Sequence, residues 1–589
     1  MKVFVRILAV IGGLLIIGLV VGVGIWSILR LGKGIVPGKT ILEVDLETGM
    51  IEDIPDDPIA ALTLREAPVV RDMVEALEKG ANDSRVVGLV AKVGAAPVGM
   101  AQIQELRDAV IAFRAKKKPA IAYSETFGEV GTGTGAYYLA TAFDEIWLQP
   151  SGDIGLTGII LESPFVRGTL DKIGVKPRMD HRYEYKNAMN FFTDKKYDPH
   201  YREAMERLMN SWFSQIVAGI AKSRHLTEGQ VRALADRGPF LGKEAVDAGL
   251  VDGLAYRDEV YSKVKKKAGE GAKLLYLRQY LKRAGRPHQQ GKTIALVYGV
   301  GSVTRGENGY RPMSGETSMG SDSITQAFRT AVADRSVKAI IFRVDSPGGS
   351  YVASDTIWRE TLKAKQAGKP VIVTMGNLAG SGGYFVAMAA DKIVAQPGTI
   401  TASIGVLGGK MLTSGLWDKL GLSWDEVHTS ANATMWTGTH DYSEPEWRRF
   451  QAWLDRVYID FTGKVAEGRK LPKEKVLQIA KGRIWTGEDA KGLGLVDELG
   501  GFPAALRLAK KAAGIPEGDD VNLKVYPPKK GPLEMILEEP PENSDPQAAV
   551  AALAAGMREL QPAVRQLRSL GILGAERGVL SMPEISPTP

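Results

Sequence analysis

The sequence predicts an α/β protein that contains two copies of one domain behind an apolar N-terminal segment. A pattern of residues repeats at a nearly constant interval along most of the chain. Within each copy, short β-branched runs alternate with segments of helical periodicity. A stretch of 23 residues without a charge lies near the N-terminus. Several domains are also expected from the length of 589 residues, because single cores seldom exceed about 300 residues.

The apolar stretch Ile7–Leu29 is long enough to cross a bilayer, since its 23 residues span roughly 35 Å as a helix. A cleavable signal peptide has a shorter apolar region and a small-residue cleavage site, which this segment lacks. We therefore expect a single-pass signal anchor in the inner membrane, with a cytoplasmic N-terminus and the body on the periplasmic side. The charges that flank the stretch are balanced and do not fix this orientation. A buried core helix is the alternative, although the five glycines among the first 24 residues suit a membrane helix better.

The repeat is visible in long matching blocks. "DSRVVGLVAKV" at 83–93 matches "DRSVKAIIFRV" at 334–344, and the interval is 251 positions. "TGAYYLATAFDEIWLQP" at 134–150 matches "SGGYFVAMAADKIVAQP" at 381–397 at an interval of 247. The interval stays near 250 over about 210 residues, so we interpret the blocks as two copies of one domain.

The repeat predicts a division of the chain into five segments. They are the stub and anchor at 1–38, the first copy at 39–263, a basic linker at 264–291, the second copy at 292–527 and a tail at 528–589. The tail is rich in Pro and Glu and then in Ala and Leu, with helical spacing from Ala548 to Leu573. A docking helix and a surface helix on a flexible linker both agree with this composition.

Strands and helices alternate within the second copy in steps of about 30 residues, which is typical of largely parallel α/β units. In chain order we expect a helix at 323–334, strands at 339–347 and 369–376, a helix from 382 and a strand at 391–397.

Composition excludes several kinds of chemistry. The chain has no cysteine, so disulfides, thiolate metal sites and a cysteine nucleophile are excluded. The net charge of +7 is small for this length, and no zinc spacing or basic stripe with interleaved aromatics is present. We expect no metal, no cofactor and no nucleic-acid partner.

The two copies differ at positions that carry reactive groups. Ser381, in "GNLAGSGGYF", corresponds to Thr134 in the first copy, and "DSPGGS" corresponds to "GAAPVG". Lys186, in "YEYKNAM", corresponds to Ala433 in the second copy. Each copy therefore keeps a reactive group that the other lacks, as expected if one active site is built across both.

A lysine can serve as the base for a serine nucleophile if its amine is neutral. The side-chain pKa of a free lysine is near ~10.4, so burial or a neighbouring cation must lower it by several units. The side chains near Lys186 are able to exclude water from it: Tyr183, Tyr185, Met189, Phe191 and Phe192. A surface lysine is the alternative for this residue taken by itself.

A glycine turn supplies the third element of acyl-transfer chemistry. Such chemistry needs N–H donors directed at a developing oxyanion, and the "SPGG" turn after a buried strand lets the backbone approach a substrate closely. The amide of Gly382, directly after Ser381, is a natural second donor. An ordinary turn is the alternative interpretation.

With these residues in place, the chain resembles the signal peptide peptidase A family in its long, tandem-repeat form. The blocks that carry the resemblance are "VDSPGGS", "GSGGYF", "ADKIVAQPGTITASIGV", "YKNAM" and "GLVDELGG", and it covers about residues 1–527. It implies two tandem domains of the Clp protease and crotonase type, built from repeated ββα units. It also implies a membrane-anchored serine endopeptidase that degrades cleaved signal peptides and similar hydrophobic peptides.

The resemblance assigns roles to five residues. Ser381 would be the nucleophile, Lys186 the general base, Ser403 the residue that orients the lysine, and Gly349 and Gly382 the oxyanion hole. It further implies a homotetramer with inward-facing sites. One departure is Asp345, where relatives often carry asparagine, which affects local hydrogen bonding.

Three alternatives stay open. A histidine-based hydrolase would have to use His428 or His440, and "AGSGG" lacks the first glycine of a G-x-S-x-G elbow. A crotonase-like acyl-CoA enzyme would share the fold, although an export anchor argues against cytoplasmic CoA. An inactive membrane-anchored scaffold would not need to keep the serine in one copy and the lysine in the other.

Overall fold

The computed structural model describes residues 34–528 together with Leu580 and Ser581. The expected anchor and most of the expected tail lie outside the described residues. Among the residues described, no helix combines the length and the apolar character that a membrane crossing requires.

The first half of the chain folds around a six-stranded parallel sheet. Its strands, in spatial order, are β8 (Gly253–Leu254), β4 (Glu145–Leu148), β3 (Ala120–Ser124), β2 (Val86–Val93), β1 (Thr40–Leu46) and β9 (Lys273–Tyr276). The central strands are buried on both faces, which explains their continuous apolar runs.

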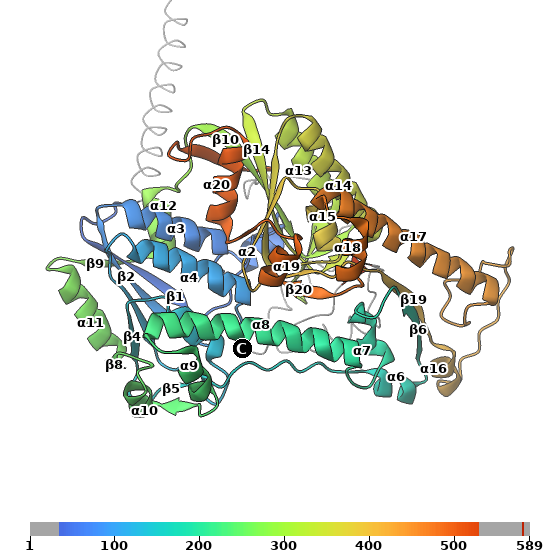
Figure 1. The fold of residues 1–589 in the computed structure, drawn as a ribbon, viewed down its shortest axis with the longest axis horizontal. Coiled ribbons are helices and arrows are strands. Elements are labelled where there is room, and N and C mark those ends of the chain that lie inside the picture. The colour runs from blue at the N-terminus through green and yellow to red at the C-terminus, as the bar shows by residue number, and fades with distance from the viewer. Residues whose placement is uncertain (1–33, 529–579, 582–589) are drawn as a thin grey trace, which may run out of the picture.

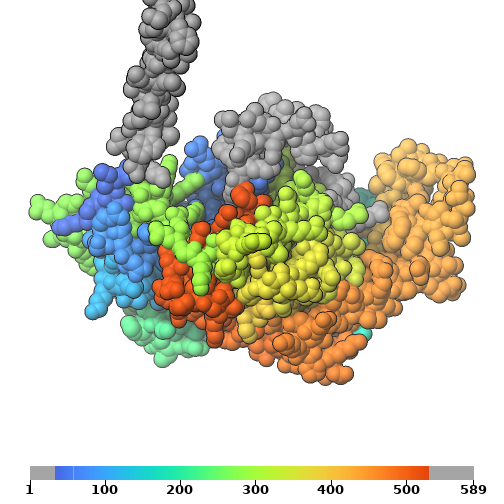
Figure 2. Space-filling view, turned by 90° about the horizontal axis from the view of Figure 1, so that it is seen from above, coloured from blue at the N-terminus to red at the C-terminus, as the bar shows by residue number. Residues whose placement is uncertain are grey.

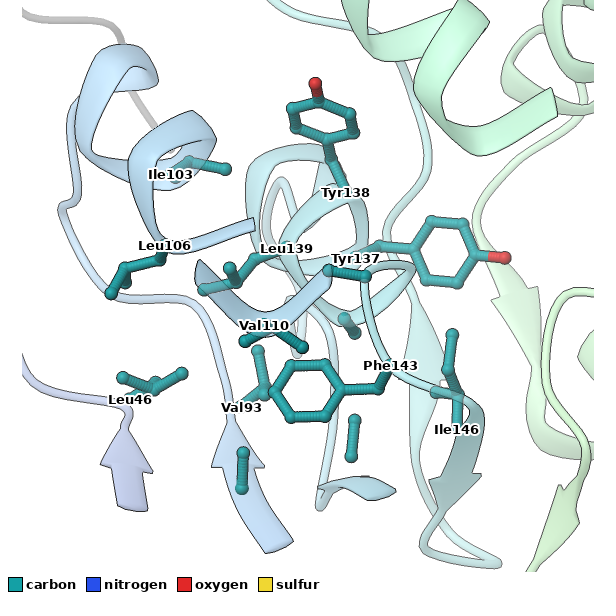
Figure 3. Packing of buried hydrophobic residues seen from close by; sticks show 14 of the residues in the cluster. Leu46, Val93, Ile103, Leu106, Val110, Tyr137, Tyr138, Leu139, Phe143 and Ile146 are labelled. Atoms are coloured by element: carbon teal, nitrogen blue, oxygen red, sulfur yellow. The ribbon is translucent and has the colours of Figure 1, made fainter. Parts of the chain in front are cut away.

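Helices cover both faces of this sheet. One face carries α3 (Val70–Asn82), α4 (Met100–Arg114) and α5 (Thr134–Ala140), and the other carries α11 (Arg257–Ala268). Figure 3 shows the core under α4 and α5, where the side chains of Val93, Val110, Leu139 and Phe143 lie together. The result is a three-layer α/β arrangement.

The second half folds around a sheet with the same strand order. Its corresponding strands are β21 (Glu498–Leu499), β17 (Lys392–Ala395), β16 (Val371–Gly380), β14 (Val337–Ser346), β10 (Lys292–Val300) and β22 (Val521–Val525). The strands β18 (Ile400–Ala402) and β20 (Ile484–Thr486) extend the sheet beside β16. One face carries α13 (Ser321–Ala333), α14 (Tyr351–Gln366) and α15 (Gly382–Ala387), and the other carries α20 (Phe502–Ala512).

The two halves also repeat individual hydrogen bonds. The Tyr137 hydroxyl donates to the carbonyl oxygen of Leu250 at 2.7 Å, and the Tyr384 hydroxyl donates to that of Leu495 at 2.9 Å. One ion pair recurs in the same way, as Arg224–Asp252 in the first half and Arg469–Asp497 in the second. Equal strand order and equal buried bonds indicate one structural unit used twice.

The predicted α/β class is confirmed, and the five elements expected in the second copy correspond to α13, β14, β16, α15 and β17. The segment 264–291, expected to be a linker, contains the end of α11, β9 and α12 (Leu277–Ala284). Because β9 pairs with β1, this segment completes the first sheet as well as connecting the two halves.

Several elements join the halves. Strand β6 (Lys176–His181) pairs antiparallel with β19 (Leu407–Leu412) of the second half. The long helix α8 (Pro199–Arg224) runs below both sheets in Figure 1, and its Trp212 indole donates to the carbonyl oxygen of Gly398 at 2.9 Å. A smaller sheet contains β12 (Gly309–Arg311), β13 (Glu316–Gly320), β11 (Ser302–Thr304), β15 (Gly348–Gly349) and β23 (Leu580–Ser581).

The remaining elements are short or peripheral. They are α2 (Pro58–Thr63), β5 (Asp153–Ile154), α6 (Arg167–Ile173), the 3₁₀ turn Asn187–Met189, α7 (Asn190–Thr193), α9 (Glu228–Ala235), β7 (Phe240–Leu241), α10 (Gly242–Asp247), α16 (Ser414–Lys419), α17 (Glu444–Arg469), α18 (Lys473–Ile479) and α19 (Gly487–Leu493). The region around α16 projects from the side of the molecule, in amber and orange in Figure 2. We call residues 413–443 the second arm.

Candidate active site

Ser381 lies on the sharp turn between β16 and α15. Its backbone has φ 53° and ψ −112°, a conformation that costs a residue other than glycine about 1–3 kcal/mol. The amide of Ser381 donates to the carbonyl oxygen of Ala402 at 2.7 Å, which fixes the turn to β18. The side chain is fully buried. The fold therefore holds this hydroxyl in one place at the end of a central strand.

The pairing of β6 with β19 brings Lys186 to the same place. After β6 the chain continues along the second half, where the Arg182 amide donates to the carbonyl oxygen of Val406 and the Tyr185 amide to that of Lys481. The next residue is Lys186, whose Nζ lies 2.8 Å from Ser381 Oγ. Residues 195 positions apart thus meet at hydrogen-bond distance.

Ser403 provides two further contacts for the amine. Lys186 Nζ lies 3.0 Å from the carbonyl oxygen of Ser403 and 3.0 Å from its Oγ. The Ser403 hydroxyl donates a hydrogen bond to the carbonyl oxygen of Gly482 at 3.4 Å. Three oxygen atoms therefore surround Nζ in a fixed arrangement.

Burial sets the protonation state of this lysine. Lys186 is fully buried, and desolvation lowers its pKa well below the ordinary value of 10.5. The space around its stem is closely filled: a Cβ on Gly482 would lie 2.5 Å from Lys186 Cβ, and one on Gly405 would lie 3.2 Å from Lys186 Cδ. Burial thus favours the neutral form of the amine.

The glycine turn and the residue after the serine lie against each other. A Cβ on Gly382 would be 3.0 Å from the amide nitrogen of Gly349 and 3.0 Å from Gly348 Cα. Gly349 has φ 154°, and a side chain there would clash with the backbone of Val303 on β11. The two backbone segments that would form an oxyanion hole are therefore adjacent to each other and to the turn of Ser381.

All five predicted site residues are brought together, and their counterparts in the opposite copies are elsewhere. The Thr134 hydroxyl donates to the carbonyl oxygen of Gly158 at 2.6 Å, and Ala433 is exposed on the second arm. His428 and His440 also lie on that arm, beside Glu426. Neither histidine is part of the site around Ser381.

Sequence reasoning missed Gly482, which leaves the room that Lys186 occupies. Its counterpart in the first copy is Arg237, 245 positions earlier. The same comparison between copies that singled out Ser381 and Lys186 would have found this difference.

Comparison with known proteins identifies the class. Residues 112–270 and 363–516 match Peptidase family S49. "Protease 4" of Salmonella typhi is 32% identical over 556 residues, which is 88% of this chain and 85% of the relative. "Serine protease SPPA, chloroplastic" of Arabidopsis thaliana is 30% identical over 76% of this chain and 66% of the relative. The α/β fold and these matches define a serine peptidase.

The chain belongs to peptidase family S49. "Protease 4" of Haemophilus influenzae is 31% identical over 75% of this chain and 72% of its own length. Among solved structures, a point mutant of ClpP1 from Listeria monocytogenes overlaps 36% of this chain and 94% of its own, with 15% identity and a TM-score of 0.22.

Proposed function

We propose that this peptidase is an endopeptidase in which Lys186 is the general base for Ser381. The observation that carries the proposal is the 2.8 Å contact between Lys186 Nζ and Ser381 Oγ inside a site without exposed surface. A neutral amine has two N–H donors and one lone pair. The two oxygens of Ser403 accept the N–H groups, and the lone pair faces the Ser381 hydroxyl.

The reaction follows from this arrangement. Lys186 takes the proton of Ser381 as Oγ forms a bond to the carbonyl carbon of the scissile peptide. The resulting ammonium then gives that proton to the leaving amine, the C–N bond breaks and an acyl-enzyme remains. In the second half, Lys186 takes a proton from water, and the hydroxide adds to the ester. Lys186 returns the proton to Ser381 as the acid product leaves.

Three further residues act on the same step. We assign the amides of Gly349 and Gly382 to the oxyanion, since the two backbones are adjacent and beside Ser381. Ser403 orients the amine, because both of its oxygens lie 3.0 Å from Nζ. Its hydroxyl directs its own proton to Gly482, so it accepts from the lysine and does not donate to it.

The substrate binds as an added strand in this proposal. One edge of β15 pairs with β11. The other edge pairs antiparallel with β23, so that Leu580 faces Gly349 and Ser581 faces Gly348. An extended peptide on that edge lies directly beside Ser381. Cleaved signal peptides and similar hydrophobic peptides are the proposed substrates, on the family resemblance.

The deciding experiment is covalent labelling with a fluorophosphonate. We expect the reagent to modify Ser381 in the wild type, to fail with Ser381→Ala, and to react far more slowly with Lys186→Ala. Thr134→Ala is the matched control and should be labelled like the wild type. Labelling of another serine, or equal rates with and without Lys186, would refute the dyad.

We also propose that the two halves are tandem domains of the Clp and crotonase type, at 39–263 and 292–527, behind a membrane anchor. Equal strand order supports the repeat, and the uncharged stretch Ile7–Leu29 supports the anchor. Flotation with lipid vesicles tests the anchor: the full chain should float and a chain starting at residue 36 should not. Protease protection in spheroplasts tests the periplasmic position of the body.

A homo-oligomer, a tetramer by family resemblance, is the proposed assembly. The arm of the first half, residues 166–196, is inserted into the second half through the pairing of β6 with β19, whereas the corresponding second arm projects outward. The second arm carries exposed apolar side chains, namely Leu420, Leu422, Trp424, Val427 and Trp436. A second copy of the chain would bury them and repeat the contact head to tail. Light scattering should show that Trp424→Glu with Val427→Glu lowers the oligomer mass.

A further inference from the structure

The strand that leads to Ser381 is interrupted opposite Asp345. β14 and β16 pair in regular parallel register as far as Val344, which faces Met375. The next pair is Ser346 with Ala379, so three residues of β16 face the single residue Asp345. We call Gly376–Leu378 the β16 bulge. A bulge of this kind leaves part of the backbone ladder disrupted.

The Asp345 side chain takes over part of that ladder. Its Oδ1 accepts a hydrogen bond from the amide of Leu378 at 2.8 Å. Leu378 is three residues before Ser381, and Asp345 is three residues before Gly348 at the glycine turn. One carboxyl group therefore ties the segment that bears the nucleophile to the segment that leads to the oxyanion strand.

The first half of the chain braces the bulge from the other side. The Asn377 side-chain oxygen accepts from the amide of Gln102, in the first turn of α4. The Gln102 side chain donates to Glu52 Oε1 at 2.9 Å. A Cβ on Gly376 would lie 3.0 Å from Asp345 Cγ and 3.1 Å from Glu52 Oε1, so a side chain here would press against both carboxyl groups.

If Glu52, Glu105 and Asp345 were all ionised, the charge of Arg343 alone would not neutralise them. Arg343 forms buried ion pairs with Glu52 and Glu105, each at 2.8 Å. Asp345 is a third carboxyl group near this single guanidinium. Burial and then the charge of Glu52 raise the pKa of Asp345 to about 7, against the opposing effects of Arg343 and of the amides of the bulge.

We propose that Asp345 is a positioning residue for the peptidase reaction, which in its ionised form holds the β16 bulge and thereby keeps Ser381 aligned with the Gly348–Gly349 strand. It does not touch the reacting atoms and acts through the amide of Leu378. The ionised carboxylate accepts that N–H more strongly than the neutral acid does. The proposal rests on the proposed role of Ser381.

The ionisation has a measurable consequence. In this proposal, activity requires a neutral Lys186 and an ionised Asp345. Loss of a proton from either residue therefore raises kcat as the pH increases. Below both pKa values, kcat of the wild type should fall about 100-fold per pH unit, which is the slope for two ionisations. Each group alone accounts for about tenfold per unit.

Two substitutions and one matched control test this. Asp345→Asn keeps an oxygen for the Leu378 amide but cannot ionise, so its acid limb should fall only about tenfold per pH unit, and its kcat at high pH should stay below that of the wild type. Asp345→Ala removes the acceptor and should lower kcat by about 100-fold at every pH, with little change in KM. The control is Asp391→Asn, because Asp391 accepts from the Val371 amide at the opposite end of β16, also at 2.8 Å. It should match the wild type.

Two results would overturn the positioning role: an unchanged double ionisation in Asp345→Asn, or wild-type kcat in Asp345→Ala. If Asp345→Ala does not fold, the slope of Asp345→Asn decides alone. Fluorophosphonate labelling of the wild type separates this failure from that of the proposed function. If the wild type is labelled at Ser381 and is active, but substitution of Asp345 changes neither kcat nor its pH dependence, only the positioning role is refuted.

Discussion

The carboxyl ends of the strands have different surroundings in the two sheets. At the end of the first sheet lies a cavity of about 560 Å³, whose lining includes Glu47, Gly94, Thr126 and Thr132. Gly94 is the counterpart of Asp345 in the second copy. At the corresponding end of the second sheet, the arm of the first half covers the strand ends, and Lys186 is buried against Ser381. One scaffold thus carries an open end and a closed end, and the closed end holds Ser381 and Lys186, the residues of the proposed dyad.

The largest expected effect comes from removing the base. Lys186→Ala should lower kcat by at least about 10⁴-fold, as loss of one member of a catalytic unit does in other serine hydrolases. Thr134→Ala, at the position of the first copy that corresponds to Ser381, should leave kcat unchanged. Steady-state hydrolysis of a fluorogenic peptide measures both. Activity in Lys186→Ala near that of the wild type would mean that the closed end is not the reactive one.

Exchanging a glycine and an arginine between the copies should have the next largest effect. Gly482→Arg introduces a side chain where even a Cβ lies 2.5 Å from the Lys186 stem, so the amine is displaced. We expect a loss of about 100-fold or more in kcat. The reciprocal change Arg237→Gly is the control and should retain kcat. Circular dichroism verifies that both variants fold.

A smaller loss is expected at Ser403, whose counterpart in the first copy is Leu156. Ser403→Ala removes the hydroxyl acceptor at 3.0 Å but keeps the backbone carbonyl, so the amine loses one of two anchors. We expect kcat to fall about tenfold to 100-fold with KM little changed. Ser403→Thr keeps the hydroxyl, and its failure to retain more activity than the alanine variant would argue against an orienting role.

The buried lysine also predicts how stability depends on pH. Its pKa is lowered in the folded protein and returns to about 10.5 on unfolding. Between these values the unfolded chain binds one more proton, so the free energy of unfolding rises with pH across that window. Lys186→Met should lack this contribution. Between neutral pH and about pH 10, the melting temperature of the wild type should therefore rise more steeply with pH than that of Lys186→Met.

The smallest effect concerns the edge of β15. Leu580 and Ser581 occupy the position that a substrate strand takes in the proposed mechanism, so they compete with it. A chain that ends at residue 527 should have a lower KM for peptides and the same kcat. A raised KM would mean that this segment helps to bind substrate. Leu580→Pro in the full chain tests the same pairing, since proline removes an N–H from the strand.

Much of this structure was predictable because the chain contains its own comparison. Two copies of an α/β unit followed from the constant interval, and Ser381 and Lys186 followed from what each copy lacks. The pairing of β6 with β19 was not predictable, since neither strand has a pattern that names its partner. The bulge opposite Asp345 is braced by a contact from the first half, which local patterns do not encode, whereas the difference at Gly482 could have been found by comparing the two copies.

The arm that carries Lys186 makes the proposed active site depend on both halves of the chain. In the proposed mechanism, the first half carries the base, Lys186, and the second half carries the nucleophile, Ser381. Neither half alone holds both groups of the dyad. In the folded protein, the pairing of β6 with β19 brings Lys186 to Ser381. In the proposed mechanism, proteolytic activity therefore requires both halves to be folded against each other.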